Sequence, residues 1–499
     1  MSCRFLIFAA MIVATLCAFG DSPPDRSSFD LYFRNETLRV DCYHVGDARE
    51  EWVTIDQLFL QGNWAGSIVH LIDPYQIGRY CVKIFDAATE KLIFSKSYDT
   101  YFGEYRTTDA ALRGDRRTFH ESVLIPLPKN KIVMTFEMRD PSSSIRTLLR
   151  REIDPASVRF NREGLCPDVK VVEVLENGDP HEKVDLALVA EGYTRDEEAK
   201  FAADLDRVKN VFFQQEPYRS RRSAFNIRGV FKPSDERGVD EPARGIFRNT
   251  SVQSSFDALG LERYLLTEDN RRLRDITAAV PCDIIVILAN HNRYGGGGIF
   301  NTYCIFAVDS PLFDYLLLHE FGHAFAGLAD EYYTSAVAYN GFYPAGIEPR
   351  EPNITALLDP ANVKWKEWLS PKIPVPTPWE KDEYEKIGRE FERMRQEINQ
   401  KIAVLSKEGK REQEIGKLRG EVQMLPQKRE DAMRRFFRNN RSRGKVGVFE
   451  GAGYTSKGLY RPMLDCLMFS SGTKPYCRPS PSERMVPRSH RSTKSTCGT

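Results

Sequence analysis

The sequence predicts a multidomain protein with an N-terminal all-β sandwich, a following α/β domain, and an α-helical hairpin inserted in that second domain. Three patterns support this fold class. Residues 28–153 alternate apolar and polar side chains over short runs, as half-buried strands do. Buried strands and a helix alternate from residue 168 onward, and apolar residues recur every three or four positions within 378–443. A chain of 499 residues has room for two or three such domains.

Residues 1–20 predict a secretory signal peptide. A short basic region at Arg4 precedes an apolar stretch from Phe5 to Phe19, and a polar break follows at Asp21. This stretch of 15 residues is short for a membrane span, and no other segment of the sequence is apolar enough to be one. We therefore expect a secreted protein, extracellular or periplasmic, without a membrane span.

The region 28–153 predicts the β-sandwich. Runs such as 38–45 and 132–138 alternate apolar and polar residues, and turn-forming residues separate the runs. The region contains no recognisable catalytic constellation.

The region 168–478 predicts an α/β domain. Residues 184–190 form a continuous apolar run that is typical of a buried strand. Thr194 and Glu197 then have the spacing of a capping box, which predicts a helix to about residue 215. Further strands are expected at 225–231 and 283–289. This order indicates a twisted, mixed sheet.

Four consecutive glycines, Gly295 to Gly298, precede an expected strand at 299–308. The run lacks the Lys-Ser/Thr pair of a phosphate-binding loop and is not followed by a helix. Two interpretations remain open. The segment is either an edge strand that pairs with an extended peptide, or a loose surface hairpin.

The sequence from His319 to Tyr332 carries the clearest chemical signal, H-E-x-x-H. Histidines four apart on a helix lie one turn apart on the same face, so His319 and His323 can bind one metal ion. Glu320 is then placed to deprotonate a water that the metal activates. The preceding residues 315–318 are apolar, as expected of a buried helix.

The third metal ligand is expected to be a carboxylate. After His323 the only histidine is His490, in a polar tail, and those upstream are scattered singly (His44, His70, His120, His181 and His291). Gly327 can end the helix and let the chain turn back, so that Asp330 or Glu331 faces the metal. We favour Asp330, and Glu331 remains an alternative.

The segment 378–443 predicts an antiparallel helical hairpin with a turn near 406–409. Its many charged residues indicate mainly solvated faces, with partner binding as the alternative. The tail, 479–499, is rich in Ser, Arg, Lys and Pro and is expected to be disordered.

The net charge limits the possible binding partners, and the cysteine content bears on the cellular compartment. Seventy-one basic and 70 acidic residues give a net charge of +1, which does not favour nucleic acid or an anionic membrane as a partner. Of ten cysteines, Cys3 and Cys17 belong to the signal peptide, so eight remain, an even number compatible with disulfides in an exported chain. The most plausible pair is Cys466 with Cys477. Pairing of Cys282 with Cys304, or of Cys42 with Cys81, requires strands that bring them together.

Several motifs in order resemble the IgA-peptidase-like zinc metallopeptidases, peptidase family M sixty-four. The resemblance covers roughly residues 169–477 apart from the hairpin, and the N-terminal sandwich also resembles the domain that accompanies this unit. The motifs are EGYT at 191–194, FN at 225–226, RYGGGG at 293–298, HEFGHAFAGLADEYY at 319–333, EGAGY at 450–454 and GLYRP at 458–462.

The resemblance implies a metzincin-like zinc peptidase domain that binds one catalytic Zn²⁺ and hydrolyses peptide bonds of a protein or peptide substrate. In the long metzincin zinc motif, the glycine and the last ligand follow the second histidine by three and six residues. Here Gly327 and Asp330 follow His323 by four and seven residues, so both are shifted by one. The resemblance also implies a methionine turn beneath the zinc, for which Met468 is the first candidate and Met463 the second. The oxyanion would be held by zinc and one of four tyrosines, Tyr332, Tyr333, Tyr454 or Tyr460.

The expected function is that of a secreted zinc-dependent endopeptidase in which Glu320 acts as general base on a zinc-activated water. The alternative is an exported binding or adhesion protein with a structural or vestigial zinc site and the β-sandwich as its working part. Glu320 favours the enzyme, because a structural zinc site has no use for that carboxylate.

Overall fold

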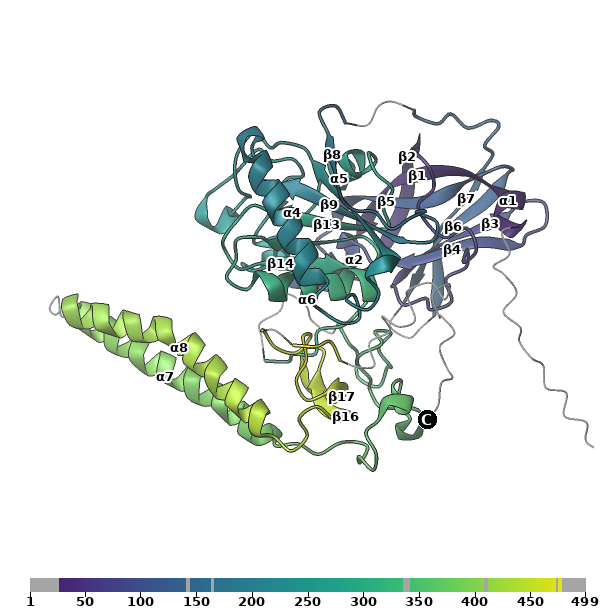
Figure 1. Ribbon diagram of the computed structural model, residues 1–499. Helices are drawn as coiled ribbons and strands as arrows, with labels where there is room; N and C mark the ends of the chain where they lie inside the picture. Colours follow the sequence, from purple (N-terminus) through teal and green to yellow (C-terminus); the bar gives the residue numbers. More distant parts are fainter. Residues whose placement is uncertain are drawn as a thin grey trace, which may run out of the picture.

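The computed structural model describes residues 27–140, 144–162, 166–334, 342–407, 412–472 and 474–477 (Figure 1). The predicted signal peptide and C-terminal tail lie outside the described residues. The N-terminal region and the sheet of the second region lie side by side, and a long helical hairpin projects from the body (Figure 1).

The N-terminal region consists of two antiparallel sheets. One has the strand order β2-β1-β5 and the other β4-β3-β6-β7. The strands are β1 (Phe33–Gly46), β2 (Glu51–Leu60), β3 (Tyr80–Asp86), β4 (Leu92–Tyr98), β5 (Arg117–Pro128), β6 (Ile132–Arg139) and β7 (Ile145–Ile153).

Buried and more exposed side chains alternate along these strands, and the buried ones form the core between the two sheets. Every second residue of β3 is buried, so Val82 and Ile84 face the same side as Tyr80. They belong to the same hydrophobic cluster as Val40 of β1 and Ile125 of β5. Side chains of both sheets therefore pack together, as the sequence pattern predicts.

Three short helices in this region were not predicted, namely α1 (Ser27–Tyr32), α2 (Tyr101–Tyr105) and α3 (Asp109–Leu112). The side chain of Thr100 caps α2 and that of Thr108 caps α3, each accepting a hydrogen bond from a backbone N–H three residues on. Helices this short have no apolar periodicity, so only their caps could have indicated them.

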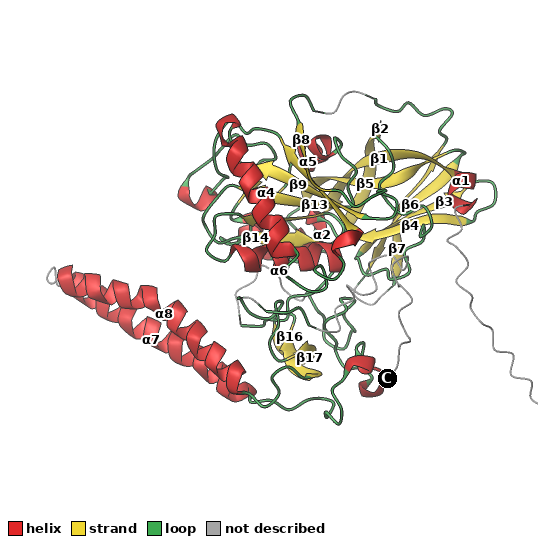
Figure 2. Ribbon diagram, viewed as in Figure 1, coloured by secondary structure: helices red, strands yellow, loops and turns green. Residues whose placement is uncertain are grey.

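The second region is built on a six-stranded mixed sheet with the order β14-β15-β13-β9-β10-β8 (Figure 2). The four inner strands are parallel, and the edge strands β14 and β8 are antiparallel to their neighbours. The strands are β8 (Lys170–Leu175), β9 (Val184–Glu191), β10 (Phe225–Phe231), β13 (Ile284–Ala289), β14 (Gly296–Ile299) and β15 (Tyr303–Ala307). The three strands predicted at 184–190, 225–231 and 283–289 are present within one residue of their expected bounds.

Both faces of this sheet are covered. Alternate residues of β9 and β13 pack on one side against α4 (Glu198–Phe212) and α6 (Phe313–Ala326). The remaining residues pack against α5 (Asn270–Thr277) and share a hydrophobic cluster with the N-terminal sheets. The two regions therefore have a continuous core. Thr194 and Glu197 form the predicted capping box ahead of α4, which ends three residues earlier than expected.

The strand predicted at 299–308 is wrong in its bounds, because the observed strand β15 covers only 303–307. The glycines themselves form the edge strand β14, the chain turns at residues 300–302, and β15 lies one strand further in. Asn301 has a φ of +55°, a left-handed conformation that asparagine tolerates better than most residues and that allows this tight turn.

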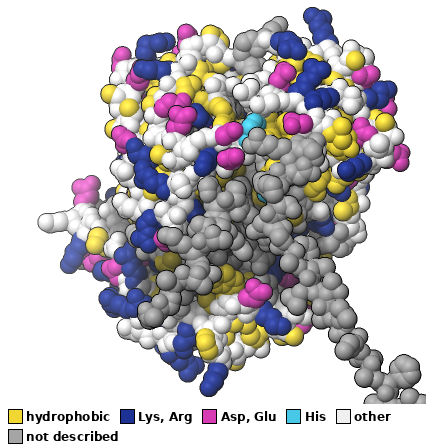
Figure 3. All heavy atoms as spheres, turned by 45° about the vertical axis from the view of Figure 1, so that its right-hand side comes forward, with side chains coloured by type: hydrophobic (Ala, Val, Ile, Leu, Met, Phe, Trp, Pro, Cys, Tyr) yellow, Lys and Arg dark blue, Asp and Glu magenta, His cyan; other side chains and the backbone are white. Residues whose placement is uncertain are grey.

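The inserted hairpin consists of α7 (Lys381–Lys407) and α8 (Glu412–Asn439). Of the turn expected at 406–409, Ser406 and Lys407 belong to α7, and residues 408–409 lie outside the described residues. Short strands β11 (Ser254–Ser255) and β12 (Leu266–Thr267) and the hairpin β16 (Val446–Ala452) with β17 (Thr455–Met463) complete the fold. Where the chain is described, no helix combines the length and apolarity needed to cross a membrane. Basic and acidic side chains are interspersed on the face in Figure 3, in keeping with the net charge of +1.

A buried ionic cluster lies inside the N-terminal region. The His44 ring nitrogens lie 3.0 Å from a Glu51 oxygen and 3.1 Å from a Glu121 oxygen, and its ring stacks on Phe102. Burial alone would lower the His44 pKa, but the two carboxylates outweigh it and raise that pKa to about 9. The native state therefore holds a proton that the unfolded chain releases near pH 6.5.

We predict that this cluster makes stability fall as the pH rises. The contribution of His44 is complete below pH 6.5 and is lost as the pH approaches 9, because only the unfolded chain loses the proton in that window. The loss should reach about 3 kcal/mol, since one pKa unit corresponds to about 1.4 kcal/mol. Denaturant unfolding measured across this range checks it. In the His44→Gln variant this component of the pH dependence should be absent, and parallel pH profiles for the two proteins would contradict the prediction.

Candidate metal centre

The helix α6 carries the H-E-x-x-H motif through the interior of the second region. Its apolar residues pack onto the sheet, so His319 and Glu320 are also buried. Gly327 ends the helix with a φ of +58°, and its N–H donates to the carbonyl of His323. The predicted helix stop is therefore present, and residues 328–331 return towards the histidines.

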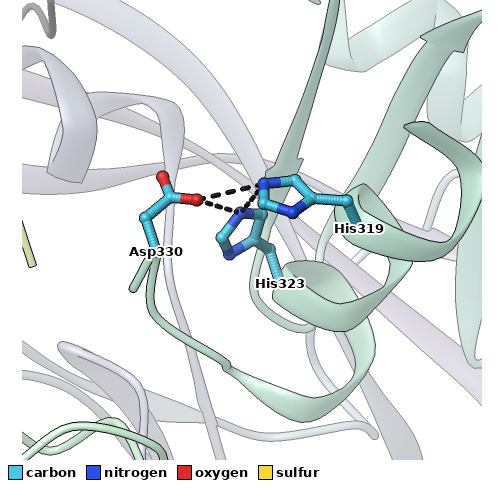
Figure 4. Close-up of side chains that lie close together, drawn as sticks. All are labelled: His319, His323 and Asp330. Carbon is cyan, nitrogen blue, oxygen red and sulfur yellow. Dashed lines mark hydrogen bonds and ion pairs between the residues drawn. The ribbon is translucent and has the colours of Figure 1, made fainter. Parts of the chain in front are cut away.

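The return segment places Asp330 opposite both histidines (Figure 4). The Nε2 atoms of His319 and His323 lie 3.2 Å apart, and Asp330 Oδ1 lies 3.0 and 3.3 Å from them. Three ligands of one tetrahedral zinc, each 2.0–2.1 Å from the ion, would be about 3.3 Å apart. Asp330 Oδ1 is also buried without a well-aligned hydrogen-bond donor. The three atoms thus have the spacing of zinc ligands, and the Asp330 oxygen has a lone pair available for a metal ion.

Backbone carbonyls fix the orientation of both imidazoles. His319 Nδ1 lies 3.1 Å from the Leu467 carbonyl oxygen, and His323 Nδ1 lies 2.6 Å from that of Leu328. A carbonyl can only accept, so each Nδ1 carries the proton and each Nε2 offers its lone pair to a metal. Leu467 precedes the fully buried Met468, and the sulfur of Met468 packs under Gly322 of α6.

Asp330 and Glu331 have different surroundings. The second oxygen of Asp330, Oδ2, accepts a hydrogen bond of 2.8 Å from the hydroxyl of Tyr454. Glu331 is turned away into a separate buried cluster, where it accepts hydrogen bonds from Cys466, Cys477 and Asn353. Of the two carboxylates left open by the sequence, the structure brings Asp330 to the histidines.

The disulfide most plausible from the sequence is not formed. Cys466 and Cys477 lie close together, but both are thiols that donate to the carboxylate of Glu331 at 3.1 and 3.0 Å. A shared acceptor gives both S–H groups a partner without a covalent bond. The other described cysteines are also free: Cys42, Cys81, Cys166, Cys282 and Cys304.

The carboxyl group of Glu320 faces the glycine-rich edge strand. Burial raises the Glu320 pKa and Asp330 adds to the rise, whereas the two histidines and Arg263 oppose it. Asp330 has a pKa well below its ordinary range because the histidines outweigh the effect of burial. Glu320 therefore keeps a proton to higher pH than an ordinary glutamate does, while Asp330 stays an anion.

The glycines allow β14 to lie directly against α6. A Cβ atom on Gly296 would lie 2.9 Å from Glu320 Oε1, and one on Gly298 would lie 2.5 Å from the Glu320 backbone oxygen. The other neighbour of Gly298 is His323 Cβ at 2.8 Å. The segment is therefore not a loose surface hairpin; its glycines make room for the motif helix.

A cleft of about 410 Å³ opens over these residues. Both regions and the inserted hairpin contribute to its walls, among them Asp99, Glu104, Arg263, Tyr294, Gly296, Glu320, Tyr332, Arg429, Phe437 and Tyr454. Of the four candidate tyrosines, Tyr332 and Tyr454 line the cleft, whereas Tyr333 and Tyr460 do not. Neither Arg263 nor Tyr294 was singled out from the sequence as a site residue. Arg263 belongs to no recognised motif, and Tyr294 belongs to RYGGGG at 293–298, where the glycines carried the signal.

Comparisons with known families decide the class of protein. Residues 172–486 match the family described as IgA Peptidase M64, and residues 28–150 match its companion, Peptidase M64 N-terminus. The chain belongs to this peptidase family. It is accordingly a metallopeptidase, which hydrolyses peptide bonds, and the resemblance noted in the sequence is confirmed. No curated protein matches the chain.

We predict that Gly296→Ala lowers the activity of this peptidase strongly while leaving it folded. The added methyl group would lie 2.9 Å from Glu320 Oε1 and 3.0 Å from the backbone oxygen of Ile305. The Glu320 side chain is the more flexible of the two, so we expect its carboxylate to be displaced. A displacement of about 1 Å in a catalytic group costs roughly 100-fold in kcat/KM. Gly420→Ala on the exposed face of α8, where nothing lies near the new Cβ, is the matched control and should keep full activity. Equal activity of the two variants, measured on an unfolded protein substrate, would argue against this close packing.

Proposed function

We propose that the chain is a secreted zinc-dependent endopeptidase in which His319, His323 and Asp330 hold one Zn²⁺ and Glu320 is the general base. The observation that carries this proposal is the triangle of two Nε2 atoms and one Oδ1 atom, 3.0–3.3 Å on each side, with Glu320 beside it. The proposed export rests on the N-terminal signal sequence.

The donor set supports zinc and a catalytic role. Two imidazole nitrogens and one carboxylate oxygen leave a fourth position of a tetrahedral ion open, as in catalytic rather than structural zinc sites. The turn at Gly327 and the buried Met468 beneath α6 support a metzincin-like arrangement. The cleft above the three ligands fits an enzyme better than a binding protein with a vestigial site.

Bound zinc would supply Lewis acidity and lower the pKa of a water molecule in the cleft. Glu320 would orient that water, accept its proton and pass it to the leaving amine. Its pKa is raised by burial, which favours accepting the proton that it later donates. No serine or cysteine nucleophile is required.

The tyrosines divide into two roles in this proposal. The hydroxyl of Tyr454 is engaged by Asp330 Oδ2, so Tyr454 positions the third ligand. Tyr332 lines the cleft, and its ring is roughly parallel to that of His319, with centroids 6.5 Å apart. Arg263 donates to its hydroxyl at 3.3 Å. We assign Tyr332 to the oxyanion that forms on the scissile carbonyl.

The first test is Glu320→Gln, which keeps the size of the side chain but removes the proton acceptor. We expect kcat to fall by about 10²–10⁴-fold, the typical contribution of a general base, while the zinc content stays near one per chain. Cleavage of an unfolded protein and metal analysis of the same preparation measure both. A variant that retains wild-type kcat with bound zinc would exclude Glu320 as the base.

The second test is a zinc-retention series. Asp330→Asn should lose zinc to a competing chelator most readily, because an amide replaces the anionic ligand. Tyr454→Phe should weaken zinc binding by about 10- to 100-fold, the usual effect of removing a partner of a ligand. Tyr460→Phe, on the same β-hairpin but outside the cleft, should match the wild type. If Glu331→Gln loses zinc and Asp330→Asn does not, the third ligand is misassigned.

A further inference from the structure

The helix α5 joins the second region to the N-terminal sheets through a series of polar contacts. Arg271 pairs with Asp56 at 2.6 Å, and Asp275 pairs with Arg39 at 2.7 Å. Asn270 donates to the hydroxyl of Ser122 at 2.9 Å. Each of these residues on α5 therefore has a partner across the junction.

Arg274 is the exception on the same helix. It is 8% exposed, and its Nε is buried without a hydrogen-bond partner. Its guanidinium forms no hydrogen bond or ion pair within the described parts of the chain, and burial lowers its pKa. A buried cation without a partner is costly, so natural proteins seldom leave one without a counter-ion.

A second cation without a partner lies nearby. Lys96 on β4 likewise has no ion pair within the described residues, and burial lowers its pKa; the charge of Arg274 adds to this lowering, and Asp283 opposes it. A third donor, the Nε2 of Gln61, is also buried without a partner. Arg274, Lys96 and Gln61 come from three separate segments, yet all three line one cavity.

The cavity lies at the junction of the two regions and has a volume of about 120 Å³. A molecule of liquid water occupies about 30 Å³, so the space holds an ion of several heavy atoms. Its walls come from the loop after β2, from β4, and from the segment that links α5 to β13. Gly62 and Asn63 on its rim are exposed, which gives access from solvent.

Among the described residues, the acidic groups that line the cavity do not balance the charges of Arg274 and Lys96. Asp283 is the only acidic residue among the described residues that line it. Its carboxylate accepts the backbone N–H of Asp185 at 2.9 Å. Burial, with the charge of Asp185 adding to it, raises the Asp283 pKa to about 7, so near neutral pH this group is only partly ionised. Two cations and an amide donor therefore face at most one negative charge.

We propose that this cavity is a binding site for a small tetrahedral oxyanion of the size of sulfate or phosphate. Arg274 and Gln61 would donate hydrogen bonds from the second region and from the sandwich, and Lys96 would add charge from β4. Because the ligands come from both sides of the junction, a bound anion stabilises the junction itself. Among the described residues, none lines both this cavity and the cleft over the metal centre, and the proposal does not depend on the proposed function.

Sulfate is the probe, with ionic strength held constant by sodium chloride. Calorimetric titration of the wild-type protein should show saturable binding near one sulfate per chain. Arg274→Met should weaken that binding by roughly tenfold or more, since it removes a charged donor. Arg271→Met is the matched control, because Arg271 is on the same helix and junction but pairs with Asp56 outside the cavity; its affinity should equal that of the wild type.

A second variant keeps the proposal testable if Arg274→Met fails to fold. Lys96 is only partly buried, so Lys96→Met should fold and should also weaken sulfate binding. Sulfate stabilises most proteins by exclusion from their surface, but that effect does not saturate and would be equal in all variants. Absence of saturable binding to the wild type, or equal affinity in the wild type, Arg274→Met and Lys96→Met, would overturn the proposal. Peptidase activity plays no part in either outcome.

Discussion

The arrangement of the site depends on one constraint: three ionisable side chains are carried by a helix that is otherwise buried. Leu316, Leu317 and Phe321 hold α6 against the sheet. His319 and Glu320 are therefore buried, and His323 is only partly exposed, in the cleft. Burial of the two imidazoles is favourable only when their ring nitrogens have partners. The partners are the Leu467 and Leu328 carbonyls on the imidazoles and Asp330 between them. Gly296 and Gly298 of β14 follow from the same constraint, because a Cβ atom at either position would occupy the space of Glu320.

The N-terminal sheets are part of this arrangement and not an appended module. Alternate residues of β9 and β13 belong to the same hydrophobic cluster as β1 and β3, so the two regions bury one core. Asp99 and Glu104 reach the cleft from the N-terminal side, and the hydroxyl of Thr302, in the turn of the glycine hairpin, donates to the Asp99 carbonyl. A shared core of this kind fixes the angle between the two regions more firmly than a polar interface would.

The features that the sequence predicts correctly are those that depend on residues close together in the chain. The buried strands, the capping box at Thr194 and the helix stop at Gly327 are all local, and all are present. The choice between Asp330 and Glu331 is not local. Tyr454 donates to Asp330, and Cys466 and Cys477 donate to Glu331, from more than 120 residues away in the chain. The same thiols were expected to form a disulfide, because spacing alone does not reveal a carboxylate between them.

The inserted hairpin packs near its base against the segment that follows Met468. Tyr384 of α7 and Phe437 of α8 pack against Phe469, the residue after Met468, with ring centroids 5.8 Å apart in both cases. Farther out, Met394, Val404 and Met424 are exposed, so the outer part of the hairpin has few constraints. Phe469 thus connects the base of the hairpin to the segment that carries the Leu467 carbonyl, which accepts from His319 Nδ1. The wall of the cleft and the orientation of His319 are for this reason not independent properties of the fold.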